Sequence, residues 1–333
     1  MDFLKDIIKE VGGEYTKIAS DIVEEERFID TGSLIFNALL SGSLYDGVSE
    51  NKITALAGKQ STGKTYFALA IVKHFLDQNP GSCCIYFDTE SAVTKSLLSS
   101  RGIELDRVLV INVVTIEEFR IKSLKLLSHY LKKPEDERPK MLMVLDSLGM
   151  LSSNKEIEDT LGEKNTKDMT KAALIKGAFR MLTLKLGVAN VPMIVTNHTY
   201  ETMSLYSTEE MSGGSGLKYA ASTIIYLSKK KEKEGTEIIG NIIKAKTNKS
   251  RFSKENQEVE VRLFYDDRGL DRYYGLLELG EMGGLWQNKA GRYEIDGKKV
   301  FGKEILRNPQ DYFTEEIMEK LNNLAKLYYS YGQ

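Results

Sequence analysis

The stretch GKQSTGKT, which begins at Gly58, constrains the fold more strongly than any other part of the chain. It matches the pattern G-x-x-x-x-G-K-[ST], in which a glycine-rich loop joins a buried strand to a helix. The apolar run KITALAG ends at Gly58, and a helical pattern covers residues 64–78. The backbone amides of such a loop and the N-terminus of its helix surround phosphate oxygens. The sequence therefore predicts a nucleoside triphosphate site within an α/β fold.

Two residues of this loop have specific predicted roles. Lys64 is expected to reach the β- and γ-phosphates, and the Thr65 hydroxyl is expected to hold Mg²⁺. A nucleoside triphosphate and Mg²⁺ are therefore the expected ligands, with ATP as the default nucleotide. The residues predicted to contact the nucleotide are Gly58, Lys59, Gln60, Ser61, Thr62, Gly63, Lys64, Thr65 and Tyr66.

Short apolar runs alternate with helical patterns over most of the chain, which is typical of a parallel sheet covered by helices on both faces. Helices are predicted over 64–78, 116–131 and 167–187. The later runs EIIGNIIKAK and EVEVRLFY predict adjacent strands that extend the sheet in antiparallel fashion. The earlier strands are predicted at KITALAG, CCIYFDTE, RVLVINV, MLMVLDS, VPMIVTNH and STIIYLS.

The two ends of the chain lack the alternating strand and helix patterns of the central part. Apolar residues at helical spacing predict an N-terminal helical arm within residues 1–27, which either packs on its own core or docks on a neighbouring subunit. A core over 28–268 and a small C-terminal region over 269–333 complete the predicted organisation. In that last region, Trp286 and Tyr293 are interpreted as holding a small hairpin together, before an amphipathic helix near 314–327.

Charge and cysteine content limit the classes of partner and compartment. Lysine and arginine total 46 against 48 acidic residues, so no global basic field attracts nucleic acid and any such contact must be local. The only cysteines, Cys83 and Cys84, are adjacent in an apolar run, which favours buried strand residues in a reducing compartment. The N-terminus is unlike a secretory signal and no apolar run suffices for a membrane span. We therefore expect a cytoplasmic protein without membrane contact.

Three carboxylates follow the predicted strands. Asp146 ends the run MLMVLDS, where it can bind magnesium through Thr65 or a water. Asp88 and Glu90 end CCIYFDTE on the same side of the strand. One of them can act as general base, and either can cap the following turn; capping is the favoured role for Asp88.

The chain resembles the RecA recombinases in several motifs that occur in the same order and spacing. The likeness covers about residues 28–265, and NHTYET makes it closest to phage recombinases of the UvsX kind. The motifs are DTGSLIFNALLSG, AGKQSTGKT, YFDTESA, VLDSLGML, TNHTYET and SGGSGLKYAAS.

This resemblance implies a RecA-type ATPase core that assembles head to tail on single-stranded DNA and exchanges strands with a homologous duplex. By matching positions, Glu90 is the catalytic base, Asp146 the acid beside magnesium, and Asn197 with His198 the sensor pair. The family usually has glutamine where His198 stands, and a histidine can make the switch depend on pH. The family often has an aromatic ring over the base where this chain has Leu97, so apolar contact would replace stacking.

The DNA-facing loops of the family correspond here to about 152–166 and 199–217. The second loop contains Leu205 beside residues whose rings or apolar ends can stack on bases. Gly216 and its neighbouring glycines would allow close approach to the strand or nucleotide. A solvated lysine face or an ordinary flexible loop explains these features almost as well. The expected DNA-binding residues are Lys167, Lys171, Lys176, Arg180, Tyr200, Met203, Tyr206, Gly213 and Gly214.

In the family, a lysine from the adjoining subunit reaches the γ-phosphate. The stretch IIKAKTNKSR offers Lys246 as the best match, with Lys244, Lys249 and Arg251 as rivals. Such a cation would stabilise transition-state charge as an arginine finger does, so hydrolysis would depend on assembly. Repeated head-to-tail contacts that do not close give a helical filament.

Two other functions fit the same core. A hexameric replicative helicase has this fold, although only about 27 residues precede the resembling region here. An ATP-gated recombination mediator would assemble on partners without exchanging strands. Expected partners of the recombinase are single- and double-stranded DNA, further copies of the chain, a single-strand-binding protein and a loading mediator.

Overall fold

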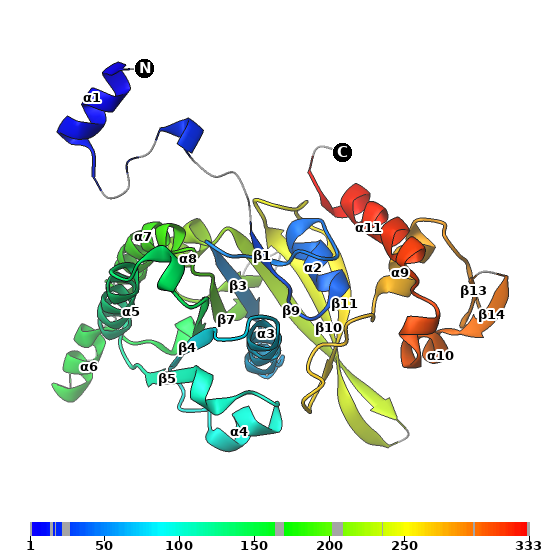
Figure 1. Ribbon diagram of the computed structural model, residues 1–333. Helices are drawn as coiled ribbons and strands as arrows, with labels where there is room; N and C mark the ends of the chain where they lie inside the picture. The colour runs from blue at the N-terminus through cyan, green and yellow to red at the C-terminus, as the bar shows by residue number, and fades with distance from the viewer. Residues whose placement is uncertain are drawn as a thin grey trace.

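The computed structural model describes residues 2–13, 16, 18–21, 27–163, 170–201, 209–234, 236–295 and 297–331. Within these residues, nine strands form one mixed sheet in the order β11-β10-β9-β3-β7-β6-β4-β5, with β8 paired to β7. Six of them run parallel, and β10 and β11 continue the sheet beyond β9 in antiparallel fashion (Figure 1). The bounds are β3 (Ile53–Gly58), β4 (Cys83–Asp88), β5 (Val108–Asn112), β6 (Met141–Asp146), β7 (Met193–Glu201), β8 (Glu209–Met211), β9 (Thr223–Glu234), β10 (Glu237–Lys249) and β11 (Glu258–Phe264).

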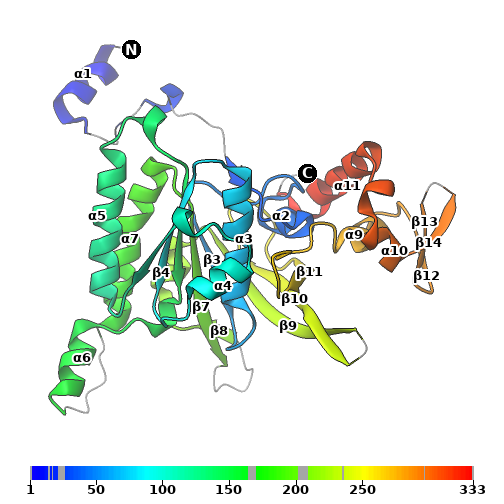
Figure 2. The same ribbon diagram turned by 60° about the horizontal axis from the view of Figure 1, so that its bottom comes forward.

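Helices cover both faces of the sheet, as the near-continuous apolar strands predict. Along β4, Cys84 and Tyr86 join one buried cluster, while Ile85 and Phe87 join the cluster on the opposite face. Figure 2 shows α5 and α7 side by side on one face and α3 on the other. The predicted α/β fold is therefore confirmed. The principal helices are α2 (Leu34–Ser41), α3 (Lys64–Gln78), α5 (Ile116–Leu131), α7 (Lys171–Ala189) and α8 (Ser215–Ala220).

The two stretches expected as loops contain regular structure, which corrects that expectation. Helix α6 (Asn154–Leu161) occupies much of 152–166, because the Ser153 side chain caps it by accepting a hydrogen bond from Glu156 N at 3.0 Å. The stretch 199–217 contains the end of β7, strand β8 and the start of α8. Helix α7 begins at Lys171; the predicted start at 167 lies outside the described residues.

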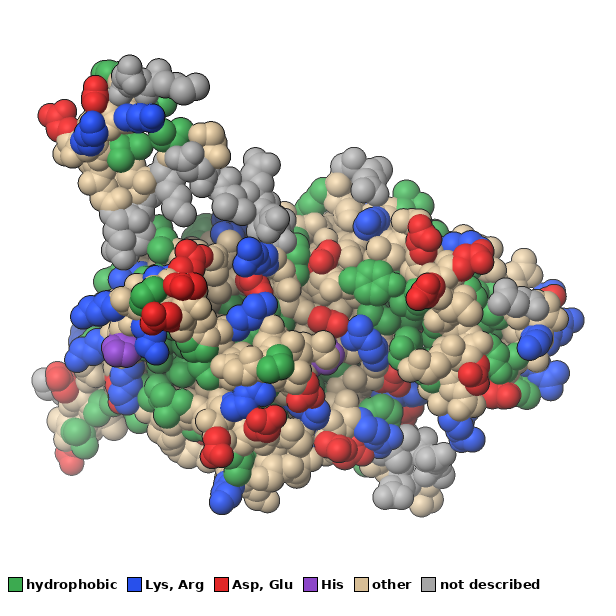
Figure 3. All heavy atoms as spheres, in the orientation of Figure 1, with side chains coloured by type: hydrophobic (Ala, Val, Ile, Leu, Met, Phe, Trp, Pro, Cys, Tyr) green, Lys and Arg blue, Asp and Glu red, His purple; other side chains and the backbone are tan. Residues whose placement is uncertain are grey.

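The N-terminal helix α1 (Asp2–Val11) stands away from the sheet (Figure 1). Its apolar residues are exposed: Phe3 is 75% and Val11 72% exposed. Figure 3 shows hydrophobic side chains on the surface of this projecting helix. The interpretation that the arm packs on its own core is therefore wrong for α1.

The C-terminal residues extend the main core. The indole of Trp286 is buried and donates a hydrogen bond to Leu277 O at 2.8 Å, and Tyr293 is buried in the same cluster as α2 and α3. Tyr293 also accepts a hydrogen bond from Asn288 Nδ2 at 2.9 Å within the small sheet, whereas the hydrogen bond of Trp286 goes to a helix beside that sheet. Its elements are β12 (Asn288–Lys289), β13 (Arg292–Ile295) and β14 (Lys298–Phe301), flanked by α9 (Leu276–Met282), α10 (Gly302–Arg307) and α11 (Glu315–Tyr329).

Strands β1 (Phe28–Ile29) and β2 (Val48–Ser49) form an antiparallel pair beside the main sheet. Both cysteines are free thiols. Among the helices the structure describes, none is long and apolar enough to cross a membrane.

Candidate nucleotide site

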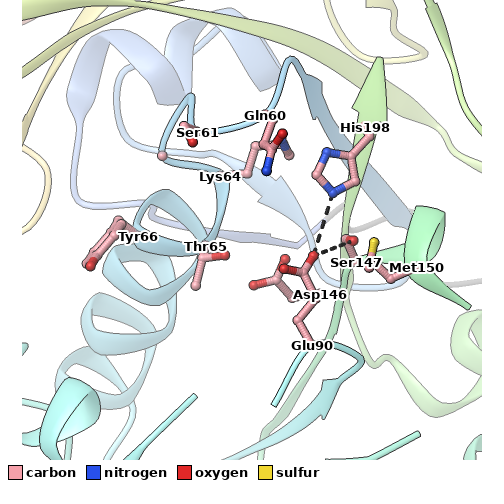
Figure 4. A pocket seen from close by; sticks show the side chains of 11 residues that line it. Gln60, Ser61, Lys64, Thr65, Tyr66, Glu90, Asp146, Ser147, Met150 and His198 are labelled. Atoms are coloured by element: carbon pink, nitrogen blue, oxygen red, sulfur yellow. Dashed lines mark hydrogen bonds and ion pairs between the residues drawn. The ribbon is translucent and has the colours of Figure 1, made fainter. Parts of the chain in front are cut away.

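A cavity of about 460 Å³ opens at the carboxyl ends of the parallel strands, where α/β sheets bind ligands (Figure 4). The start of α3 forms one wall, and the ends of β4, β6 and β7 supply the others. The cavity therefore brings together residues that are far apart in the sequence. Its lining residues are Gln60, Ser61, Gly63, Lys64, Thr65, Tyr66, Glu90, Asp146, Ser147, Met150 and His198.

The glycine-rich loop has a fixed shape that exposes its backbone to the cavity. Gly63 adopts φ 92°, a left-handed conformation that favours glycine. At Gly58, a Cβ would lie 2.5 Å from Leu227 O, so only glycine fits beside β9. The predicted contacts Gly58, Lys59 and Thr62 do not line the cavity; Thr62 Oγ1 donates to Lys59 O at 3.0 Å and closes the loop from behind.

Lys64 is held inside this loop. Its Nζ donates to Gly58 O and to Lys59 O, each at 2.9 Å, and the residue is 6% exposed. Burial lowers the pKa of the Lys64 ammonium, and the charges of Asp146 and Glu90 oppose this shift. A lysine positioned by two carbonyls can move to phosphate oxygens without leaving the cavity.

Asp146 is braced from behind by two hydroxyl groups. Tyr86 donates to its Oδ2 at 2.7 Å, and Thr196 donates to its Oδ1. Burial, together with the Asp146 charge, raises the pKa of Tyr86 well above its ordinary value, so this phenol stays a donor. The carboxylate therefore has one orientation, facing the same space as Thr65 in Figure 4.

The side-chain oxygens of Thr65 and Asp146 fit magnesium rather than a metal bound by protein groups alone. Within the described part of the chain, no group of three His, Cys, Asp or Glu side chains could hold a metal ion. Mg²⁺ typically takes one or two protein oxygens and completes its shell with phosphates and waters. Thr65 and Asp146 meet that requirement.

Glu90 and Asp88 have different surroundings. Asp88 is 2% exposed and accepts from Glu90 N at 3.0 Å and Val93 N at 2.9 Å, so it caps the turn after β4. The side chain of Glu90 is 42% exposed and points into the cavity, where Ser147 Oγ donates to its Oε1 at 3.2 Å. Of the two acids, only Glu90 can reach a water in the cavity.

The expected sensor pair is split by the alternation of β7. His198 lines the cavity, with its Nε2 3.6 Å from Glu90 Oε1. Asn197 is fully buried and faces the other way, donating from Nδ2 to Ser212 O at 2.9 Å and accepting from Ser212 Oγ at 2.8 Å. Asn197 therefore connects the cavity strand to the segment that follows β8, and does not itself face the nucleotide space.

The expected DNA-binding residues fall partly on the described chain. Lys176 and Arg180 are both exposed on α7. Lys171 forms an ion pair with Glu156 of α6 at 3.3 Å, and Tyr200 is 51% exposed at the end of β7. Lys167, Met203, Leu205 and Tyr206 lie outside the described residues.

The expected glycines bring α8 close to the start of α7. A Cβ at Gly216 would lie 2.7 Å from Lys176 N, so this glycine is needed for the close approach. Gly213 and Gly214 both have positive φ, 85° and 73°, in the turn that joins β8 to α8. Their role in the structure is to shape the return of the second loop.

The four candidate cations of β10 and its end are absent from the lining of the nucleotide cavity in the described chain. Lys244 and Lys246 are exposed on the same face of β10, and Lys244 pairs with Glu258 at 2.8 Å. Lys249 instead donates to Lys218 O at 2.8 Å and Ala221 O at 2.7 Å, at the end of α8.

Sequence reasoning missed several residues of the site. Ser147 and Met150 line the cavity directly after Asp146, and Tyr86 and Thr196 brace that carboxylate from neighbouring strands. Period-two alternation carried a signal for Thr196, because it shares a face with His198 on β7. Lys229 of β9 also reaches the loop, donating to Ser61 O.

Comparisons with known proteins agree with this geometry. The family model for the RecA N-terminal domain matches residues 2–271. A recombination and repair protein of Enterobacteria phage T4 is 33% identical over 295 residues, which cover 88% of this chain and 74% of that protein. Protein RecA of Clavibacter michiganensis subsp. michiganensis is 26% identical over 318 residues, covering 93% and 83% of the two chains. Protein RecA of Nocardioides sp. is 26% identical over 331 residues, covering 96% and 90%.

Proposed function

This chain belongs to the RecA family, and we propose that it is an ATP-dependent homologous recombinase. It forms helical filaments on single-stranded DNA and catalyses pairing and strand exchange with a homologous duplex. The observation that carries the proposal is the convergence of Lys64, Thr65, Glu90 and Asp146 on one cavity at the strand ends. An intact set of this kind supports an ATPase rather than an inert scaffold.

The positions of these side chains support ATP hydrolysis. Lys64 binds the terminal phosphates, while Thr65 and Asp146 would hold Mg²⁺, which would supply positive charge to the phosphate oxygens. Glu90 accepts a hydrogen bond from a water in the cavity and orients it toward the γ-phosphate. His198 lies beside Glu90 and senses whether that phosphate is present, because its Nε2 faces the same space.

A second copy completes the site. Lys246 is exposed on an open face of β10 and does not line the cavity of its own chain, which supports a role across a subunit boundary. From there its charge stabilises the transition state in the neighbour's cavity. ATP then favours the assembled state that binds DNA, and loss of the γ-phosphate weakens it.

The projecting helix α1 is the proposed docking arm of the filament. It carries exposed apolar residues away from its own core, and a helix with such a face requires a partner surface. A chain lacking residues 1–13 should bind ATP normally yet fail to form filaments in electron microscopy. Filaments of normal length from that chain would refute the arm's role.

DNA binding is assigned to α7 and to the two stretches 152–166 and 199–217. Lys176 and Arg180 supply phosphate contacts, and Tyr200 supplies a ring that can stack on a base. Accessory single-strand-binding and loading proteins belong to this proposal, as does a cytoplasmic location, where ATP and DNA are both accessible.

Strand exchange tests the proposal directly. The purified chain, ATP and a single strand are incubated with either a homologous or a heterologous duplex, and joint molecules are measured on gels. Product should form only with the homologous duplex and only with ATP. No product, together with DNA-stimulated ATPase activity, would indicate a mediator; closed rings in electron microscopy would indicate a helicase.

A further inference from the structure

The glycine-rich loop is contacted by a lysine that lies far outside its own motif. Lys229 is on β9, 168 residues beyond Ser61 in the chain, and its Nζ donates a hydrogen bond to Ser61 O. Residues 59–62 form the exposed turn of this loop, which we call the crown. Resting on the proposed ATP-binding function, we propose that Lys229 is a positioning residue that holds the crown in the shape that binds phosphate.

The crown has a backbone conformation that requires support. Ser61 has φ 60°, in the left-handed region that glycine adopts freely and serine adopts only at a cost. Gly63, two residues later, is also left-handed. Left-handed residues of this kind occur where successive backbone N–H groups turn toward an anion. Because Ser61 is exposed, burial of its side chain does not hold it in this conformation.

Strand β9 supplies that support from behind the loop. The backbone of β9 lies close to Gly58, since a Cβ at Gly58 would be 2.5 Å from Leu227 O. Lys229 is two residues beyond Leu227 and therefore points to the same side of the strand. The C=O and N–H groups of a trans peptide point in opposite directions. The bond from Lys229 to Ser61 O therefore turns the next N–H, that of Thr62, away from Lys229 and toward the other side of the loop.

This role differs from the one proposed for the lysines of β10. Lys229 pairs with Ile243, which is buried in the core, whereas Lys244 pairs with Ser228. Paired residues share a face and neighbours alternate, so Lys244 and Lys246 lie on the opposite face from Lys229. Figure 2 shows β9 and β10 extending together beyond the rest of the sheet. Lys229 therefore acts on the phosphate loop of its own chain.

Loss of this contact should affect binding and not the chemical step. Without it, the crown can leave the left-handed conformation, and part of the phosphate-binding free energy must be used to order it again. Once the ligand is bound, the loop has the same shape as in the parent. An interaction that stabilises ground state and transition state equally changes KM and leaves kcat unchanged.

Calorimetry on the full chain with Mg²⁺ tests this, using ATP and inorganic triphosphate as probes. Lys229→Met should weaken both ligands about fivefold, because both are held by the loop. The kcat for DNA-stimulated ATPase activity at saturating ATP should stay within about twofold. Lys229→Arg retains a donor and should recover most of the lost affinity. Lys230→Met is the matched control, because it removes an equal charge from the next exposed residue on the opposite face of β9.

A second substitution tests whether Lys229 acts through Ser61. Glycine adopts the left-handed conformation without the cost that serine has. In a Ser61→Gly chain, Lys229→Met should therefore weaken ATP binding by no more than about twofold. Equal losses in the two backgrounds, equal losses from Lys229→Met and Lys230→Met, or a lower kcat with unchanged affinity would overturn the proposal. The predicted affinities in a chain that gives no strand exchange would refute the proposed recombinase function and leave this inference intact.

Discussion

The nucleotide cavity and the exposed face of β10 both carry lysines, but in opposite environments. In the cavity, Lys64 is buried and held by two loop carbonyls, and Asp146 is fixed by two hydroxyl groups. On β10, Lys244 and Lys246 are exposed and do not line the nucleotide cavity of their own chain. The difference teaches that one chain contains a preformed cavity with a fixed lysine and carboxylate, whereas the lysines of β10 are available to another molecule, as the proposed function requires.

Removal of the buried lysine should have the largest effect. Lys64→Ala removes the cation that contacts the terminal phosphates, so ATP affinity should fall by more than about 100-fold and turnover should be lost. Calorimetric titration with ATP and Mg²⁺ measures this. Lys73→Ala, on the same helix but outside the cavity, is the control and should bind ATP as the parent does. Equal losses in the two variants would mean that α3 itself had been disrupted.

Removal of the exposed lysine should instead separate binding from cleavage. Lys246→Ala should leave ATP affinity within about twofold, because the residue does not line the nucleotide cavity of its own chain. DNA-stimulated ATPase activity should fall by about 10³-fold, the lower range for a cation supplied in trans. A larger loss in Lys244→Ala would reassign the role to that residue.

Mixing two variant chains tests more directly whether the lysine of β10 acts in the cavity of a neighbouring subunit. A chain with Glu90→Gln still presents Lys246, and a chain with Lys246→Ala still contains Glu90. Filaments assembled from both should regain part of the ATPase activity, because some boundaries combine the two intact residues. If mixing restores nothing, the cation acts within its own chain and the comparison fails.

The third prediction lies within the cavity. Glu90→Gln preserves the side-chain volume but removes the charge that orients water, so the turnover rate should fall by about 10²-fold with ATP and DNA binding retained. A DNA-stimulated ATPase assay at saturating ATP measures the rate. An unchanged rate would show that Glu90 is not the base, and Ser147 or His198 would then need to position the water.

Much of the nucleotide cavity could be predicted from the sequence, because the motifs that form it are local in the chain. The loop before α3, and Asp146 at the end of β6, follow from apolar strands and a motif of fixed spacing. Two corrections also had local signals. Ser153 and Glu156 form the S-x-x-E pattern that begins a helix, and alternation along β7 implies that Asn197 and His198 face opposite sides.

The remaining contacts have no local signal. Arg101 meets Tyr66 and the carbonyls beside Tyr265 only because β11 and α4 (Lys95–Ser100) are brought to the same end of α3. No periodicity relates residues so distant in the chain. The bracing of Asp146 by Tyr86 depends similarly on the register of β4 with β6, in which Asp88 lies beside Asp146. Such pairings are set by tertiary packing.

The smallest predicted effect tests whether the buried contacts around α3 stabilise the chain without a neighbouring subunit. Asp30 lies at the far end of α3, where its carboxylate accepts from Gly32 N and Asn37 Nδ2 at 2.8 Å and from Arg272 at 2.9 Å, near His74. Burial alone would raise the pKa of Asp30, but the hydrogen bonds from His74, Asn37 and Gly32 and the charge of Arg272 lower it well below its usual range. Its stabilising contribution is therefore complete above the unfolded-state pKa of about 3.9 and is lost as the pH falls through the folded-state value.

Asp30→Asn should lower the free energy of unfolding by about 2 kcal/mol at pH 7, and by less at pH 3. Urea unfolding at both pH values measures this difference, which should not vary with protein concentration because every partner lies within one chain. A difference that grew at pH 3 would contradict the lowered pKa of Asp30. A difference that appeared only at high protein concentration would place the stabilising contacts between subunits and remove the contrast with β10.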